Sequence, residues 1–108
     1  MRKMKAAVLY GIGDLRVEDL EVPEVGPGEV LAQVKAATTC GTDVKILRRG
    51  YVGDIVSYPM PFGHEWSGVV VEVGDGVEGF GVGDRIGAGN SAPCYSCVMC
   101  AEGKYNLC

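Results

Sequence analysis

The feature that most constrains this chain is a cluster of four cysteines spaced C-x2-C-x2-C-x7-C. The cluster consists of Cys94, Cys97, Cys100 and Cys108. The two-residue gaps let the chain turn around a metal ion, and the longer arm, with Gly103 as its turn, brings in the fourth sulfur. Four thiolates complete the tetrahedral coordination of zinc and leave no position open for chemistry. The spacing therefore predicts a structural zinc site.

Other kinds of site use similar spacings. An iron–sulfur cluster also takes C-x2-C-x2-C, but the bacterial ferredoxin run continues with x3-C-P, whereas the last gap here is seven residues. A redox pair at Cys94/Cys97 or Cys97/Cys100 would be expected in a thioredoxin-like βαβ unit, which the flanking sequence lacks. Unliganded thiols are the remaining alternative. We prefer zinc, and iron in a metal analysis would favour the cluster.

The composition is that of one globular domain. The 108 residues are 47% hydrophobic and 22% charged, which argues against disorder. A net charge of -4 argues against nucleic acid or an anionic membrane as a partner. No stretch approaches the roughly 20 apolar residues of a membrane span, and no signal-peptide pattern is evident. We therefore expect a cytoplasmic protein, in which disulfides are rare.

Short apolar strands and glycine-rich turns predict a mostly-β barrel or sandwich. Strands are expected at 4–10, 15–22, 30–37, 68–73 and 85–88. The apolar alternation in 30–37 predicts one fully buried face. One helix is expected at 42–49, with Thr42 as its N-cap and Asp43 in its first turn. Residues 51–63 are expected to be a loop, and residues from about 90 to 108 a zinc-binding lobe.

One glycine pattern matches a dinucleotide-binding motif in its spacing but not in its context. Residues 74–79 match G-x-G-x-x-G and follow a predicted strand. A dinucleotide fingerprint needs a helix next, because the helix N-terminus binds the pyrophosphate. The following residues 80–84 are too rich in glycine for a helix, and 87–92 fail in the same way because Pro93 and Cys94 follow. Neither segment predicts a nucleotide site.

The fifth cysteine and the only histidine lie in two further motifs, Cys40-Gly41-Thr42-Asp43 and Gly63-His64-Glu65. Taken singly, each would be an ordinary thiol or histidine, and the neighbouring Trp66 is expected in the core. Other motifs accompany them in order: Gly68, Val73-Gly74, Gly83-Asp84-Arg85, the four spaced cysteines and Asn106-Leu107-Cys108. With this order and spacing, the chain resembles the zinc-dependent medium-chain alcohol and polyol dehydrogenases. The resemblance covers essentially all 108 residues and implies a GroES-like β-barrel catalytic domain with one short helix.

The resemblance implies a role for each motif residue. Cys40 and His64 match the first two ligands of a catalytic zinc, and Glu65 matches an acidic neighbour that is an occasional ligand. Thr42 matches the hydroxyl that contacts the substrate oxygen, and Asp43 matches the carboxylate that orients the histidine. The implied reaction is oxidation of an alcohol or polyol by hydride transfer to NAD or NADP. Simpler roles stay open: an N-cap for Thr42, a first-turn charge for Asp43, and a partner of Arg85 or a lysine for Glu65.

The sequence also departs from the family pattern. The family's remaining catalytic ligand and its nucleotide-binding Rossmann domain have no counterpart in residues 1–108, so we expect an incomplete catalytic zinc site and no activity from these residues alone. Lys45 stands where many members have a histidine that passes the proton to solvent. For a full-length enzyme, the resemblance implies a small alcohol substrate and an oligomer. The alternative function is a stand-alone zinc-stabilised β-barrel for binding or assembly.

Overall fold

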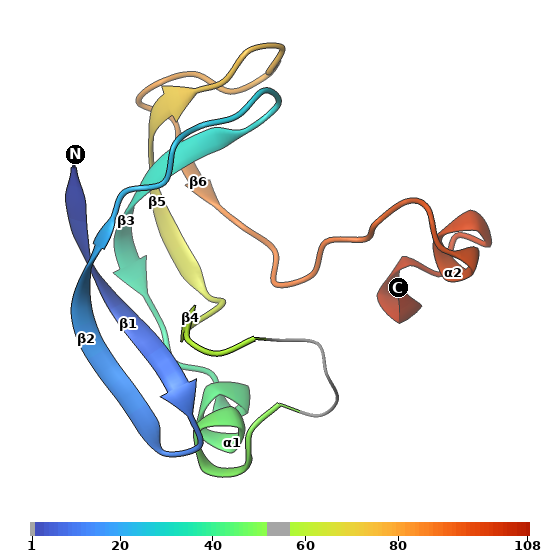
Figure 1. Cartoon of the computed structure of the whole chain (residues 1–108). Helices are drawn as coiled ribbons and strands as arrows, with labels where there is room; N and C mark the ends of the chain where they lie inside the picture. The colour runs from blue at the N-terminus through green and yellow to red at the C-terminus, as the bar shows by residue number, and fades with distance from the viewer. Residues whose placement is uncertain (1, 52–56) are drawn as a thin grey trace.

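The structure is a computed structural model that describes residues 2–51 and 57–108. Its strands form two three-stranded antiparallel sheets, shown in Figure 1. The first has the order β2-β1-β4, with β1 at Lys3–Gly11, β2 at Asp14–Glu21 and β4 at Met60–Pro61. The second has the order β3-β5-β6, with β3 at Val30–Ala37, β5 at Trp66–Val73 and β6 at Arg85–Gly87. The prediction of a mostly-β fold is confirmed.

The buried centre of the fold is small. Val8 and Leu9 of β1 are 3% and 0% exposed, and Val70 of β5 is 0% exposed. β1 is the middle strand of its sheet, because Leu9 pairs with Leu15 of β2 on one side and Met60 of β4 on the other. The middle strand is therefore covered at both edges, and its apolar side chains form the core.

Helix α1, at Gly41–Arg49, begins one residue before the predicted start. Its N-cap is Cys40, not Thr42: the Cys40 Sγ accepts the backbone N–H of Thr42 at 3.5 Å, and the Asp43 Oδ2 accepts the backbone N–H of Cys40 at 3.0 Å. This reciprocal arrangement is a capping box in which sulfur takes the place of the usual hydroxyl. The prediction of Thr42 as N-cap was wrong because the carboxylate of Asp43 reaches back to residue 40.

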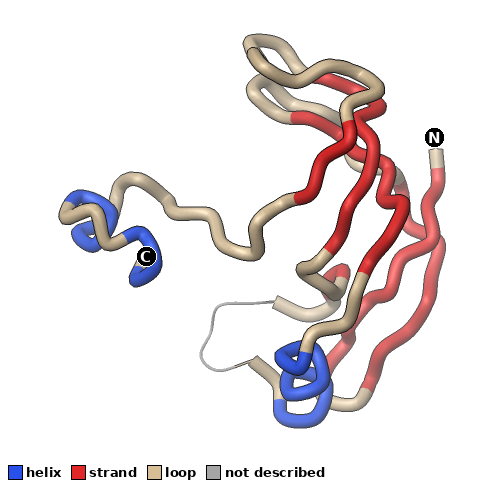
Figure 2. The backbone as a smooth tube through the Cα atoms, turned by 180° about the vertical axis from the view of Figure 1, so that it is seen from behind, coloured by secondary structure: helices blue, strands red, loops and turns tan. Residues whose placement is uncertain are grey.

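The cysteine lobe, residues 94–108, stands apart from the sheets. It contains a short helix α2 at Val98–Ala101 and a 3-10 turn η1 at Tyr105–Leu107. Within residues 2–51 and 57–108 the expectation of one α-helix is therefore corrected to two. In Figures 1 and 2 an extended segment leads from β6 to this lobe. The Cα radius of gyration, 15.7 Å, exceeds the roughly 13 Å of a compact domain of this length. Among the described residues no helix has the length and apolar character needed to cross a bilayer.

Two sequence predictions about the strands were wrong. Within the expected loop 51–63, Met60–Pro61 forms β4 and the Phe62 N–H donates to the Ala7 carbonyl at 2.9 Å. A proline is tolerated there because β4 lies at the edge of its sheet. In β3, register irregularities at Leu31/Ala32 and Val34/Ala36 interrupt the alternation, and Val34 is 55% exposed. The predicted fully buried face is therefore absent, since each bulge changes which side a residue faces.

The glycine segment 74–79 forms the turn region after β5, as predicted. No helix follows it: the next element is β6. The Gly74 N–H donates to the Glu29 carbonyl and the Gly28 N–H to the Asp75 carbonyl, both at 2.8 Å. The segment is therefore held against another turn and does not open a helix.

Gly68 lies where β3 and β5 pack backbone to backbone, because a Cβ there would overlap the Gln33 carbonyl and lie 3.2 Å from the Val34 Cα. We expect Gly68→Ala to lower the free energy of unfolding by about 1–3 kcal/mol, measured in urea by the fluorescence of Trp66. Gly11→Ala is the matched control, since a Cβ there meets nothing within 4 Å and should change the free energy by less than about 0.5 kcal/mol. Equal effects of the two substitutions would contradict this packing.

Candidate functional site

The pairing of β3 with β5 brings three candidate metal ligands together. Cys40 follows β3, and His64 and Glu65 precede β5, whose Trp66 pairs with Ala37. The ligand atoms of Cys40, His64 and Glu65 all lie within 4.8 Å of one another. The Nε2 of His64 and the Oε1 of Glu65 are 4.0 Å apart. One sulfur, one nitrogen and one oxygen form a donor set of the kind found in zinc sites with an open position.

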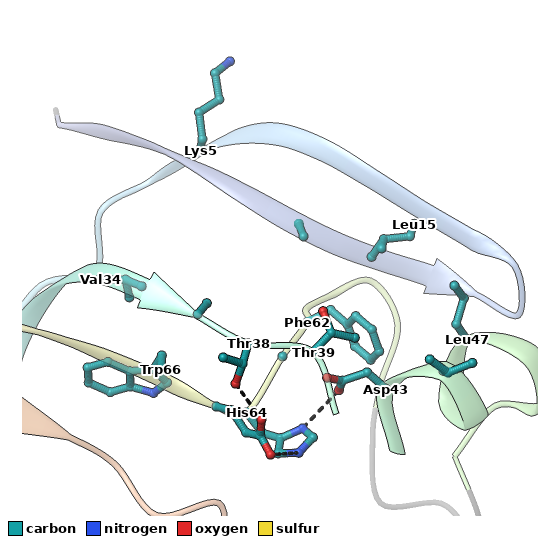
Figure 3. A pocket seen from close by; sticks show the side chains of 15 residues that line it. Lys5, Leu15, Val34, Thr38, Thr39, Asp43, Leu47, Phe62, His64 and Trp66 are labelled. Carbon is teal, nitrogen blue, oxygen red and sulfur yellow. Dashed lines mark hydrogen bonds and ion pairs between the residues drawn. The ribbon is translucent and has the colours of Figure 1, made fainter. Parts of the chain in front are cut away.

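The carboxylate of Asp43 orients two members of this group. Asp43 is 6% exposed, and its Oδ2 accepts the backbone N–H of Cys40 at 3.0 Å. Its Oδ1 lies 3.0 Å from the Nδ1 of His64, as the dashed line in Figure 3 shows, although off the direction of a regular hydrogen bond. With Nδ1 on Asp43, the Nε2 of His64 is the nitrogen left for a metal. Ligating histidines ordinarily offer their second nitrogen to a carboxylate in this way.

The surroundings of Cys40 and His64 favour a negative charge on the Cys40 sulfur. The backbone N–H and the hydroxyl of Thr42, and then the His64 ring, lower the pKa of the Cys40 thiol. Contact with Cys40, and the nearby charge of Asp43, raise the pKa of His64. Thiolate is the form of cysteine that binds metals, so the surroundings of Cys40 prepare it for that task. Thr42 is exposed in the first turn of α1, beside this sulfur.

Glu65 has a partner that the sequence analysis missed. The Thr38 Oγ1 donates to the Glu65 Oε2 at 2.6 Å. Among the described residues no lysine or arginine pairs with Glu65, so the suggested pairing with Arg85 is not observed. The register of β3 against β5 is the feature that indicates this contact. Thr38 is the next residue after Ala37, and Glu65 is the residue before Trp66. A strand pairing that reaches Ala37 and Trp66 places Thr38 opposite Glu65.

A cavity of about 510 Å³ adjoins the site and lies between the two sheets. Its polar end contains Thr38, Asp43, His64 and Glu65. Its apolar lining includes Leu15, Val34, Leu47, Phe62 and Trp66. Figure 3 shows Thr38, Asp43 and His64 grouped together at this cavity. The half-buried Trp66 is therefore a wall of the cavity, which corrects the expectation that it belongs to the core.

The structure also brings the four spaced cysteines together. The sulfurs of Cys94, Cys97, Cys100 and Cys108 all lie within 4.8 Å of one another. The Cys94 and Cys100 sulfurs are 4.0 Å apart, close to the edge of about 3.8 Å expected for a tetrahedron of sulfurs 2.3 Å from zinc. The cluster therefore has the dimensions of a four-thiolate zinc site.

Backbone N–H groups point at these sulfurs. The Cys94 Sγ accepts the N–H of Cys97 at 3.2 Å and that of Ser96 at 3.4 Å. The Cys97 Sγ accepts the N–H of Cys100 at 3.4 Å, and the Cys108 Sγ accepts the N–H of Cys94 at 3.3 Å. Donors aimed at sulfur favour thiolate over thiol. The local turns therefore support negative charge at this cluster.

Cys94 and Cys108, at the two ends of the cluster, have pKa values shifted in opposite directions. The hydroxyl and N–H of Ser96 and the N–H of Cys97 lower the pKa of Cys94 to about 5. At Cys108 the N–H of Cys94 favours the thiolate, but the side chains of Cys94 and Cys100 outweigh it and raise the pKa to about 11. Like charges this close disfavour one another. A divalent cation would remove that conflict, so the donor set fits zinc.

Comparison with known proteins agrees with the resemblance seen in the sequence. Residues 26–108 match the family described as the alcohol dehydrogenase GroES-like domain. The sorbitol dehydrogenase of Bombyx mori is 45% identical over 109 residues, which cover 100% of this chain and 31% of that protein. The sorbitol dehydrogenase of Bacillus subtilis (strain 168) is 39% identical over 108 residues, which cover 99% of this chain and 31% of that protein.

Solved structures share the fold as well. The cobalt- and zinc-bound thermostable alcohol dehydrogenase of Pyrobaculum aerophilum has a TM-score of 0.83 and 33% identity, with 99% of this chain and 32% of that chain covered. The chain thus spans 31% of the length of the curated relatives named above. By sequence and by structure, the chain belongs to the family of alcohol dehydrogenase GroES-like domains.

Proposed function

We propose that this chain is the metal-binding catalytic domain of a zinc-dependent dehydrogenase that oxidises alcohols or polyols with NAD or NADP. The observation that carries the proposal is the convergence of Cys40, His64 and Glu65 within 4.8 Å, with Asp43 on the second nitrogen of the histidine. A polyol is the substrate class suggested by the relatives named sorbitol dehydrogenase.

Each residue of the site has a distinct task in this proposal. A bound zinc ion would supply a Lewis acid for the alcohol oxygen, and a nicotinamide nucleotide would accept hydride. Cys40, His64 and Glu65 would hold the metal. Asp43 keeps the Nδ1 of His64 engaged, which fixes the ring orientation. The Thr42 hydroxyl, exposed beside Cys40, would accept a hydrogen bond from the alcohol and relay the proton to solvent by releasing its own.

The four-cysteine cluster has a structural task. Of residues 94–108, Cys100 alone is buried, at 6% exposure. A segment with so little apolar burial needs another source of folding free energy, and structural zinc sites provide one. We therefore assign Cys94, Cys97, Cys100 and Cys108 to a zinc site that folds the lobe.

Two separate sites should differ in affinity and respond to different substitutions. We expect two zinc ions per chain at saturation, with the four-cysteine site tighter than the Cys40 site because it supplies four soft ligands. Cys100→Ser should abolish the tight step and leave the weak one; Cys40→Ser should do the reverse. Competitive titration against a chromophoric chelator, with metal analysis, measures both. Loss of the same step in both variants, or iron in place of zinc, would contradict this assignment.

Removal of zinc should loosen the cysteine lobe and spare the sheets. We expect a chelator to accelerate tryptic cleavage after Lys104, which lies in the lobe, by at least about tenfold, because metal binding supplies the folding free energy there. Cleavage after Arg16, in β2, is the internal control and should stay at its original rate. The Cys40→Ser variant should respond as the parent does. A lobe equally protected with and without chelator would refute its dependence on metal.

The activity itself can be tested in two steps. The 108 residues alone, mixed with NAD or NADP and a panel of alcohols and polyols, should form no reduced nicotinamide, since they offer three ligands at the open site and no nucleotide fingerprint. A chimera in which this chain replaces the matched segment of the Bombyx mori sorbitol dehydrogenase should oxidise a polyol.

Cys40→Ser is the informative variant of that chimera. It should reduce kcat/KM by more than the roughly 10–100-fold that changes outside the ligand set produce. Val17→Ala, at a position in β2 that is 75% exposed, is the control and should leave kcat/KM within a few-fold. A folded chimera without activity, or one that tolerates Cys40→Ser, would refute the proposed function.

A further inference from the structure

Thr38 is joined to Glu65 through both its backbone and its side chain. The Thr38 N–H donates to the Glu65 carbonyl at 3.1 Å, which continues the β3–β5 pairing by one residue. Directly opposed residues on antiparallel strands present their side chains on the same face. The Thr38 Oγ1 accordingly donates to the Glu65 Oε2 at 2.6 Å. That distance is in the range of a charge-assisted bond from a hydroxyl to a carboxylate.

This bond determines which oxygen of Glu65 faces the site. With Oε2 held by Thr38, Oε1 is the oxygen 4.0 Å from the Nε2 of His64. Nitrogen and oxygen ligands of one tetrahedral zinc ion are about 3.4 Å apart. Only a small movement of Oε1 would therefore place it in the coordination sphere. Without the hydrogen bond from Thr38, the side chain of Glu65, which is 44% exposed, is free to turn into solvent.

The hydrogen bond from Thr38 to Glu65 orients the carboxylate more than it stabilises the fold. Thr38 and Glu65 are both exposed, and contacts between exposed polar groups contribute little to folding. Among the described residues no cation competes for Glu65, so Thr38 and His64 are the side chains that act on its carboxylate. Both Thr38 and Glu65 also line the polar end of the cavity. The Thr38 hydroxyl therefore determines the direction in which the Glu65 carboxylate points.

We propose that Thr38 is a positioning residue, which holds Glu65 as the third ligand of a divalent metal at Cys40 and His64. The inference rests on the proposed function, since it needs a metal at that site. The new element is Thr38: the place of Glu65 in the ligand set, which the proposed function already includes, is made to depend on the hydroxyl of Thr38.

The test uses three threonine variants of the chain, titrated with cobalt after the four-cysteine site is filled. Thr38→Val removes the donor and keeps the shape, and Thr38→Ser keeps the donor. Thr39→Val is the matched control, because Thr39 is exposed, lines the same cavity and makes no side-chain hydrogen bond among the described residues. We expect Thr38→Val to weaken cobalt binding at the second site by about 10–100-fold. Thr38→Ser and Thr39→Val should stay within about threefold of the parent.

Three further measurements separate positioning from a loss of structure. The cobalt absorption spectrum of Thr38→Val should shift toward that of Glu65→Gln, because both lose the carboxylate oxygen. Adding Thr38→Val to Glu65→Gln should cause no further loss of affinity. The midpoint of urea unfolding of the metal-free chain should be the same for the parent and Thr38→Val; should that variant fail to fold, Thr38→Ala takes its place.

The possible failures point to different conclusions. If Thr38→Val binds like the parent while Glu65→Gln is weakened, the positioning role is overturned and the proposed function stands. If Glu65→Gln also binds like the parent, Glu65 is not a ligand and the inference is again overturned. If Cys40→Ser and His64→Gln bind the second cobalt like the parent, the proposed function itself fails.

Discussion

The site depends on one structural constraint, the antiparallel pairing of β3 with β5. Neither Cys40 nor His64 is near the other in sequence, and no helix carries both. They meet because β3 ends at Ala37, β5 begins at Trp66, and these two residues pair. A shift of register by one residue would turn every side chain of a strand to the opposite face. Gly68 helps to set the register, because its missing side chain admits the backbone of β3 at Gln33 and Val34.

The cysteine cluster and the Cys40 group illustrate two ways of building a metal site. All four spaced cysteines lie within one short segment, and local turns and the N-terminus of α2 bring their sulfurs together. The Cys40 group is assembled from the ends of separate strands, so its geometry depends on the whole domain. A locally built site with four thiolates is suited to a structural metal. A site built from distant segments with three protein ligands leaves a position for a substrate, at the cost of depending on everything that holds the strands together.

The same difference explains what could be predicted from the sequence. The cysteine spacing alone predicted the four-sulfur cluster, because its geometry is encoded by residues close in the chain. Most strands were also predicted to within a residue or two, since each is a short apolar run between turns. Strand β4 was missed because Pro59 and Pro61 argue against a strand. Only its position at the edge of the sheet, which is a tertiary property, permits it. The contact between Thr38 and Glu65 was missed for the same reason, because a register is a property of two strands.

Asp43 shows how closely folding and chemistry are joined in this domain. One of its oxygens accepts the Cys40 N–H and so caps α1, and the other lies 3.0 Å from the His64 ring. The start of the helix and the orientation of a metal ligand therefore depend on the same buried carboxylate. Cys40 has an equally double part, since its sulfur caps the helix by accepting the Thr42 N–H and is also a candidate ligand. A metal would bind the thiolate form of Cys40, and the N–H of Thr42 already stabilises that negative charge. The first turn of α1 is therefore part of the site and cannot be treated as a separate scaffold.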